Sequence, residues 1–297
     1  GSMVLEPPAL PPPAPLPLRL SGLDGLIYQL DFLARDRYLA GRDSRGRFAI
    51  WDLERGADRP LISDTGPVVY AAGSETLRYV VYQPTQGRPP AQGRLRVFAA
   101  TPDASGETAA PRERASIAVP PLRSKLAISP DGATLAAIGR ELNVYLIDLD
   151  SGEIVTLGQL STAHSQTPLE FSPAGRWLAT LDDAQSIRLW DLATRGSQLL
   201  SGHQGEIGEL SFSPDERHLM SASDDRTARL WNLETGQVRV LDGHDDDVTH
   251  SRVSPLGDTL ATASLDQSVR IWPLVRGDGE QLGGHRSGAV AALGFVS

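Results

Sequence analysis

The chain has 297 residues, and its 28 basic and 37 acidic side chains give a formal net charge of −9. This acidic balance disfavours nucleic acid and anionic membrane surfaces as partners, because both are bound through an excess of Lys and Arg. The sequence contains no cysteine and no apolar run of the roughly 20 residues that a membrane span needs, so we predict a cytoplasmic protein without disulfides or thiolate metal sites.

The chain begins with residues that we do not expect to pack into a core. Gly1-Ser2-Met3 is typical of an expression tag, and the proline-rich stretch LEPPALPPPAPLPL follows at residues 5–18. Proline fixes φ and lacks an N–H, so this stretch favours an extended polyproline II conformation. We interpret residues 1–15 as a tag and a linker, with a ligand for a proline-binding domain as the alternative.

Residues 16–297 are predicted to form one domain of short β-strands. Apolar-alternating segments of four to seven residues are separated by turns of Gly, Asp, Asn and Pro. The segments recur with a fixed period, which predicts a repeat architecture with four strands in each unit. Six units can be followed by the large apolar residue that ends the third strand of each: Trp51, Phe98, Ile147, Trp190, Trp231 and Trp272.

The motifs inside the repeats resemble those of the WD-repeat family. Gly202-His203, Ser223-Asp224-Asp225 and Trp231-Asn232 recur 41 residues later as Gly243-His244, Ser264-Leu265-Asp266 and Trp272-Pro273. The resemblance covers about residues 16–297 and implies an all-β fold, a WD-repeat β-propeller of bacterial type. We expect six full four-stranded blades and an incomplete seventh at 283–297. A seven-bladed ring closed in part by a strand at 16–21 is favoured over a six-bladed ring.

The resemblance also implies a structural tetrad in two of the units. An indole N–H can only donate and a carboxylate can only accept, whereas Ser and neutral His do both. A chain of bonds from Trp to Ser to His to Asp therefore satisfies every member in one direction. The residues that carry this prediction are His203, Ser223, Asp225 and Trp231 in one unit, and His244, Ser264, Asp266 and Trp272 in the next.

The same residues have the composition of a hydrolytic triad, which we consider the weaker interpretation. A catalytic serine must be exposed beside an oxyanion hole. Here the serine is expected beneath a tryptophan, and the whole set occurs twice. We therefore predict no catalytic residues, no cofactor and no metal site.

The remaining units depart from the tetrad pattern. Leu23 and Thr162 stand at the histidine position, and Arg45, Glu141 and Ala184 at the position of the turn aspartate. We expect those blades to be held mainly by apolar packing.

Loops on a rigid scaffold are a common site of recognition, and the WD-repeat family commonly docks proteins or peptides there. We therefore predict a non-catalytic interaction scaffold that binds a protein or peptide of basic or mixed charge. It would be a sensor or regulatory module of a larger bacterial signalling protein, with a fused N-terminal signalling domain. The candidate partner-binding residues are Arg42, Arg45, Arg140, Asp182, Asp183, Glu206, Arg226, Asp245, Asp246, Asp247 and Gln267.

Two alternatives remain open. A hydrolase or small-ligand-binding propeller would place its site in the central channel, where the inner strands supply Asp31, Lys125, Glu209 and His250. Catalysis there would need two convergent carboxylates about 5–10 Å apart. The other alternative is an oligomerisation scaffold whose open seventh blade pairs between chains.

Overall fold

The computed structural model describes residues 20–33, 38–53, 60, 62–65, 68–72, 77–84, 92–100, 112–162, 168–274 and 280–282. These residues form strands and turns, and the described ranges contain no helix. Accordingly, no helix in them is long and apolar enough to cross a membrane. The seventh unit predicted at 283–297, and most of the closing strand predicted at 16–21, lie outside the described residues.

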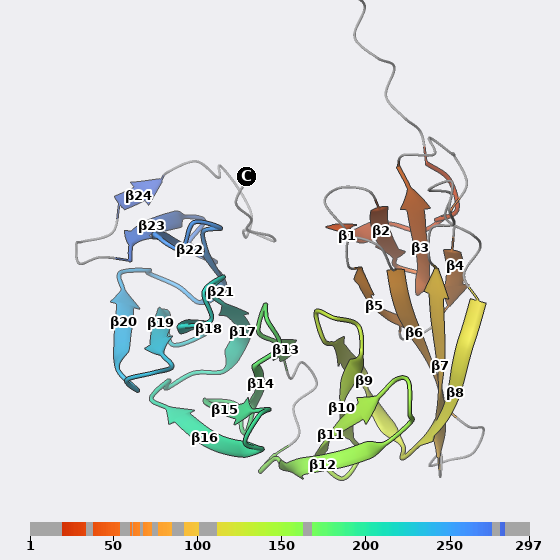
Figure 1. Ribbon diagram of the computed structural model, residues 1–297. Helices are drawn as coiled ribbons and strands as arrows, with labels where there is room; N and C mark the ends of the chain where they lie inside the picture. The colour runs from red at the N-terminus through yellow and green to blue at the C-terminus, as the bar shows by residue number, and fades with distance from the viewer. Residues whose placement is uncertain are drawn as a thin grey trace, which may run out of the picture. The chain divides into compact units, whose positions relative to one another are not determined.

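The chain divides into two compact units, Gly1–Asp64 and Thr65–Ser297, which are described separately. The first unit contains an antiparallel sheet in which β1 to β4 pair in chain order (Figure 1). Its strands are β1 (Ile27–Leu33), β2 (Tyr38–Asp43), β3 (Arg47–Asp52) and β4 (Ile62–Thr65).

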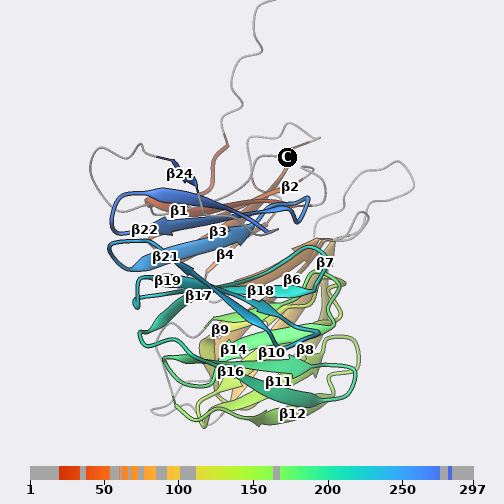
Figure 2. The same ribbon diagram turned by 90° about the vertical axis from the view of Figure 1, so that its left-hand side faces the viewer.

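The second unit repeats this four-stranded arrangement, with each sheet running antiparallel through consecutive strands (Figures 1 and 2). The first two of its described sheets are β5 (Val68–Ala72), β6 (Leu77–Pro84), β7 (Gly93–Ala100) and β8 (Arg112–Val119), then β9 (Leu122–Ile128), β10 (Thr134–Gly139), β11 (Asn143–Asp148) and β12 (Ile154–Gln159). The next are β13 (Leu169–Phe171), β14 (Trp177–Leu181), β15 (Ser186–Asp191) and β16 (Gly196–Ser201), then β17 (Ile207–Phe212), β18 (His218–Ser223), β19 (Thr227–Asn232) and β20 (Val238–Asp242). The final sheet is β21 (Val248–Val253), β22 (Thr259–Ser264), β23 (Val269–Pro273) and β24 (Glu280–Leu282).

The predicted all-β class and the four-stranded repeat are thus confirmed in the described residues. The arrangement is consistent with a β-propeller, whose blades are four-stranded sheets of this kind. The number of blades in a ring and the way it closes stay predictions.

The core lies between successive sheets, because alternate side chains of each strand point to opposite faces. Leu219 and Trp231 of the β17–β20 sheet pack against Leu189 of the preceding sheet. Their neighbours in the strands, Met220 and Leu230, belong instead to the cluster shared with the following sheet. Strands β18 and β19 are therefore buried on both faces.

The loop that leads into β17 packs directly on the turn between β18 and β19. Gly205 lies so close to that turn that a Cβ there would stand 2.5 Å from the backbone nitrogen of Asp225 and 2.8 Å from the carbonyl carbon of Asp224. The Asp224 N–H also donates to the Glu206 carbonyl oxygen over 2.9 Å. A side chain at position 205 would therefore push the loop and the turn apart.

We predict that Gly205→Ala lowers the free energy of unfolding by about 1–3 kcal/mol, because the clash involves backbone that cannot rotate away. Urea titration followed by tryptophan fluorescence measures this change. Gly208→Ala is the matched control, since a Cβ at Gly208 meets nothing within 4 Å. Equal effects of the two substitutions would contradict this account of the loop.

Candidate functional site

A buried chain of hydrogen bonds crosses the β17–β20 sheet. Trp231 Nε1 lies 2.9 Å from Ser221 Oγ, and Ser221 Oγ lies 2.7 Å from His203 Nε2. His203 Nδ1 in turn lies 2.7 Å from Asp225 Oδ2. The chain joins β19, β18, the loop before β17 and the turn between β18 and β19, so one network fixes four parts of the sheet.

The direction of this chain follows from its ends. The Trp231 indole must donate to Ser221, so the serine hydroxyl donates onward to His203 Nε2, and the histidine donates from Nδ1 to Asp225. This requires a neutral imidazole, and burial lowers the pKa of His203 despite the opposing attraction of Asp225. Burial alone would raise the pKa of Asp225, but bonds from the Thr227 hydroxyl, the Gln204 amide and His203 outweigh it and hold the value at about 2.

The serine of this chain is Ser221, so the prediction of Ser223 was wrong. Leu219 pairs with Trp231 across β18 and β19, and residues 219, 221 and 223 share one face of β18. Both serines are therefore compatible with the sequence pattern, but the indole N–H reaches only the nearer one. Ser223 lies at the end of the strand, where its hydroxyl accepts the Asp225 N–H.

The β21–β24 sheet repeats the network with a threonine in place of the serine. Trp272 Nε1 lies 2.9 Å from Thr262 Oγ1, which lies 2.8 Å from His244 Nε2, and His244 Nδ1 lies 2.8 Å from Asp266 Oδ2. The predicted Ser264 is again outside the chain, and its hydroxyl donates to the carbonyl oxygen of Asp246. Burial lowers the pKa of His244 as it does that of His203.

The preceding sheet, β13–β16, keeps part of the network and loses the rest. Thr180 and Trp190 stand at the positions of Ser221 and Trp231, but Thr180 Oγ1 and Trp190 Nε1 have no hydrogen-bond partner in the described structure. Thr162, which replaces the histidine, has too short a side chain to take the place of an imidazole between the hydroxyl and the turn. The sequence correctly predicted that this unit lacks the tetrad.

In two sheets that lack the tetrad, a carboxylate takes its place. The sequence analysis missed these carboxylates, because it expected mainly apolar packing there. Asp182 Oδ1 accepts two bonds from Arg188, at 3.0 and 2.8 Å, while its Oδ2 accepts the Ser161 hydroxyl at 2.6 Å. In the first unit the Asp43 carboxylate accepts four backbone N–H groups, those of residues 24, 25, 45 and 47. Asp182 is only 3 % exposed, so its proposed role in partner binding is corrected to a structural one.

The histidines and serines of the tetrads are not accessible for catalysis. Ser221, Ser223, Thr262 and Ser264 have no exposed surface, and His203 is 5 % exposed. A nucleophile needs to reach its substrate, so burial and duplication both favour the structural role over the hydrolytic triad.

Most of the other candidate partner-binding residues lie in exposed loops. Gln267 and Arg226 occupy equivalent turns, each with φ near 69°. Arg140 lies in the turn between β10 and β11, whereas Arg42 and Arg45 belong to the first unit. The exposed members in the second unit are Arg140, Glu206, Arg226, Asp245, Asp246 and Gln267, with Asp183 and Asp247 partly buried.

Several of these acidic side chains are close enough to interact. Burial raises the pKa of Asp224, and the negative charges of Asp247 and Glu206 raise it further. Asp247 belongs to the loop before β21, so the acidic groups of neighbouring sheets share one electrostatic environment. Among the described residues, no group of three His, Asp or Glu side chains could hold a metal ion.

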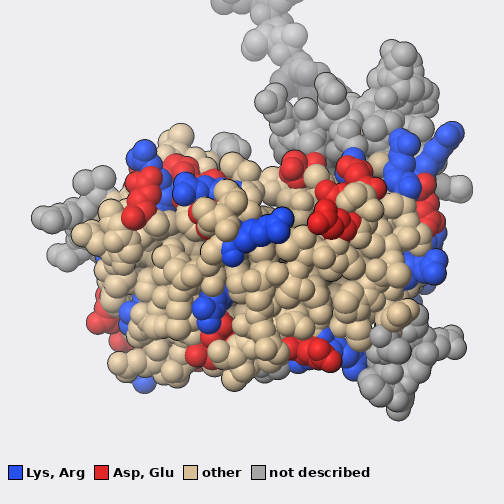
Figure 3. All heavy atoms as spheres, turned by 60° about the horizontal axis from the view of Figure 1, so that its bottom comes forward, with Lys and Arg blue, Asp and Glu red and all other residues tan. Residues whose placement is uncertain are grey.

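Charges of both signs occur elsewhere on the molecule. Figure 3 shows acidic and basic side chains in small groups, separated by uncharged residues, on the face that it presents. This face offers no continuous basic surface of the kind that nucleic acid binding requires.

The inner strands carry the predicted Glu209 and a second carboxyl group, that of Glu170, which the sequence analysis missed. Glu209 Oε2 accepts the Ser251 N–H at 2.7 Å, and its Oε1 lies 2.6 Å from Arg252 Nη1, so Glu209 joins β17 to β21. Glu170 on β13 lies near this pair, and burial raises its pKa to about 7. Arg252 and Lys125 favour the ionised form of Glu170, while Glu209 opposes it. Two other inner-strand residues were predicted as candidates. His250 places its Nδ1 3.0 Å from Thr249 Oγ1, and Asp31 belongs to the first unit.

We predict that Ser221→Ala lowers the free energy of unfolding by about 2–4 kcal/mol, because it leaves two buried groups, the Trp231 N–H and His203 Nε2, without a partner. Ser223→Ala is the matched control, with an expected loss of about 1 kcal/mol or less, since only one weak bond depends on it. Thermal and urea unfolding measure both. A larger loss for Ser223→Ala would restore the original assignment of the serine.

We predict that Glu170→Gln stabilises the protein at pH 8 by on the order of 1 kcal/mol, because it removes a half-buried charge. The folded pKa of Glu170 lies above its unfolded value, so the cost of ionisation is fully present above pH 7. It disappears as the pH falls towards 4.5. The advantage of the variant over the wild type should therefore shrink from pH 8 to pH 5 in urea titrations. A difference that does not change with pH would contradict the burial of this carboxyl group.

Comparison of the sequence with known protein families supports the assignment of the repeats. Residues 196–232 and 235–273 match the family model described as WD domain, G-beta repeat. The matched ranges run from the start of β16 to the end of β19 and from before β20 to the end of β23. No curated protein matches the chain.

Proposed function

The chain belongs to the WD-repeat family, and from this we propose that it is a non-catalytic scaffold that binds a protein or peptide on the loops of one edge of its sheets. Repeats of this family typically mediate interactions between proteins. The location of the binding surface is supported by the backbone hydrogen bonds that connect these loops. The loops carry most of the exposed candidate residues.

These loops lie at a common edge because of the strand order. In an antiparallel four-stranded sheet, the turn between the second and third strands lies at the same edge as the connection from the fourth strand to the next sheet. Backbone bonds tie the two kinds of loop together: Ile207 N–H donates to Ala184 O, and Leu265 N–H donates to Asp247 O. The Gln185 side chain adds a bond to the Gln204 carbonyl oxygen. The side chains at this edge are therefore presented by a rigid surface.

The charge of this edge favours a basic partner. Asp245 and Asp246 are exposed beside the partly buried Asp247, and Glu206 and Asp224 belong to the neighbouring loop and turn. Burial raises the pKa of Asp224, and the negative charges of Asp247 and Glu206 raise it further. Lys or Arg side chains of a ligand would relieve this repulsion. Complementary charge of this kind governs specificity and the rate of association.

We further propose a cytoplasmic sensor or regulatory module of a larger bacterial signalling protein, joined to its N-terminal domain through the proline-rich residues. A ring of seven positions with an incomplete last blade fits the length of the repeats better than a six-bladed ring. The absence of cysteine fits a reducing compartment.

The alternative, a site for a small ligand or a hydrolytic reaction on the inner strands, has one observation in its favour. Glu170 is a half-buried residue near Glu209, and this burial raises its pKa to about 7. Against catalysis, Glu209 is already engaged by Ser251 and Arg252. The interaction scaffold is therefore the better-supported function.

The test is a selection of peptides from a random library on the immobilised protein. We expect the selected peptides to be rich in Lys and Arg, and to bind at least about tenfold more weakly when Asp245, Asp246 and Asp247 are all changed to Asn. Titration calorimetry measures the affinities.

The control variant neutralises three exposed carboxylates at the opposite edge, with Asp150→Asn, Glu153→Gln and Glu234→Gln, and should keep the affinity. Equal loss in both variants would show only a non-specific charge effect. Peptides without basic residues that bind all three proteins equally would contradict the proposed edge.

A further inference from the structure

Three polar side chains inside the β13–β16 sheet make no hydrogen bond to any described residue. Thr180, Ser186 and Trp190 are 0 %, 4 % and 3 % exposed. Their polar atoms, the two hydroxyl oxygens and the indole nitrogen, are all without a partner in the described part of the chain. Buried polar groups in folded proteins are almost always hydrogen-bonded, either to the protein or to ordered water. A cluster of three such groups therefore needs a bound partner.

The next sheet shows what the equivalent groups bind when the tetrad is complete. The strand register of β17–β20 places Ser221, Thr227 and Trp231 at the positions of the three side chains. There the indole donates to the serine hydroxyl, which reaches the imidazole of His203. The Thr227 hydroxyl donates to Asp225 Oδ1 at 2.6 Å. An imidazole and a carboxylate thus complete the hydrogen bonds of the two hydroxyls.

The β13–β16 sheet has no counterpart of these two groups. Thr162 stands in place of the histidine and is exposed, so it does not occupy the buried position of an imidazole. Ala184 stands in place of the turn aspartate and has no polar side chain. The Asp182 carboxylate lies in the same turn, but it is engaged by Arg188 and by the Ser161 hydroxyl. The two hydroxyls have therefore lost both of their partners.

The Trp190 indole is held in place by its packing, so its N–H cannot turn to another group. A Cβ at Gly158 of β12 would stand 2.8 Å from Cη2 of Trp190, which means that the ring packs directly on the backbone of the preceding sheet. Trp190 also belongs to a buried cluster with Leu160 and Leu178. The partner of its N–H must therefore be small enough to enter beside the ring.

The chemistry of the three groups selects a neutral partner that can accept hydrogen bonds. The indole N–H only donates, and each hydroxyl can donate as well as accept. An ionic ligand would bring an unpaired charge into the interior, which is costly. The described residues also contain no group of three His, Asp or Glu side chains that could hold a metal ion.

Water meets these requirements. It is neutral, accepts two hydrogen bonds and donates two, and it commonly binds otherwise unsatisfied polar groups in protein interiors. We propose that ordered water binds to Trp190, Thr180 and Ser186 and takes the place of the imidazole and the carboxylate of the tetrad. This site lies inside one sheet and involves no partner protein, so it does not depend on the proposed function.

The experiment observes the indole N–H groups of the full chain by NMR, with its five tryptophans labelled with ¹⁵N. Loss of one signal in Trp190→Phe assigns Trp190. In the wild type we expect a nuclear Overhauser effect between long-lived water and the Trp190 indole proton. We expect none at Trp231 and Trp272, because those indoles donate to side-chain hydroxyls.

Two variants separate bound water from other sources of the effect. Thr180→Val keeps the shape of the side chain and removes its hydroxyl, and the effect at Trp190 should persist. Its loss would overturn the proposal, because a hydroxyl proton would then have been its source. The double variant Thr162→His with Ala184→Asp supplies the imidazole and the carboxylate, so the effect should disappear when it folds.

The wild type alone is sufficient to contradict the proposal. A Trp190 indole proton without contact to long-lived water would overturn it. Equal effects at Trp190, Trp231 and Trp272 would overturn it as well, because they would show general hydration and no site specific to the sheet that lacks the tetrad.

Discussion

The directed chain of hydrogen bonds from indole to hydroxyl to imidazole to carboxylate is the interaction on which the β17–β20 and β21–β24 sheets depend. It converts four polar side chains, each costly to bury alone, into one satisfied network. The network ends in the same turn that carries exposed charged residues, so the groups that hold the sheet also position its recognition loops. Asp225 shows this directly, because it accepts from His203 and also from the Gln204 N–H at the start of the neighbouring loop.

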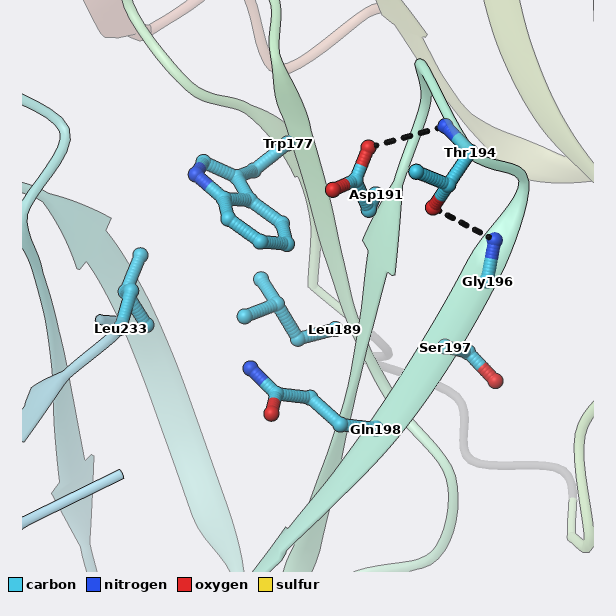
Figure 4. Close-up of a pocket in the computed structure, with 8 residues that line it drawn as sticks. All are labelled: Trp177, Leu189, Asp191, Thr194, Gly196, Ser197, Gln198 and Leu233. Carbon is cyan, nitrogen blue, oxygen red and sulfur yellow. Dashed lines mark hydrogen bonds between the residues drawn. The ribbon is translucent and has the colours of Figure 1, made fainter. Parts of the chain in front are cut away.

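In these repeats the loop before the first strand and the turn between the second and third strands meet at a buried junction. Different sets of polar groups hold this junction together. Where histidine is absent, the Asp182–Arg188 pair or the four backbone N–H groups around Asp43 take over the junction. In the β13–β16 sheet this substitution leaves Thr180 and Trp190 without hydrogen-bond partners. The grooves between successive sheets also differ: Arg239 Nη1 reaches the Pro273 carbonyl oxygen beside one of them, whereas Gln198 and Trp177 line a pocket in another (Figure 4).

The sequence predicts the repeat, the strands and the tetrad positions of His, Asp and Trp, because period and turn chemistry are local signals. It does not distinguish Ser221 from Ser223, since both occupy the same face of β18 and only the distance to Trp231 separates them. It also misses Glu170, whose pKa depends on burial and on charges from the inner strands of three other sheets. The prediction that Asp182 belongs to a binding surface was wrong for a related reason: only the fold shows that Arg188 is its partner. The pocket beside Trp177 is lined by residues of two sheets, so it could not be found before the packing of those sheets was known.

The most direct test of the central claim is the protonation of the tetrad histidines, measured by ¹⁵N NMR of the imidazole rings at pH 7. The account predicts that His203 and His244 are neutral, with the proton on Nδ1 in slow exchange with water and with Nε2 accepting from Ser221 or Thr262. A spectrum with the proton on Nε2, or with both nitrogens protonated, would contradict it, because the indole and the imidazole would then both donate to one hydroxyl.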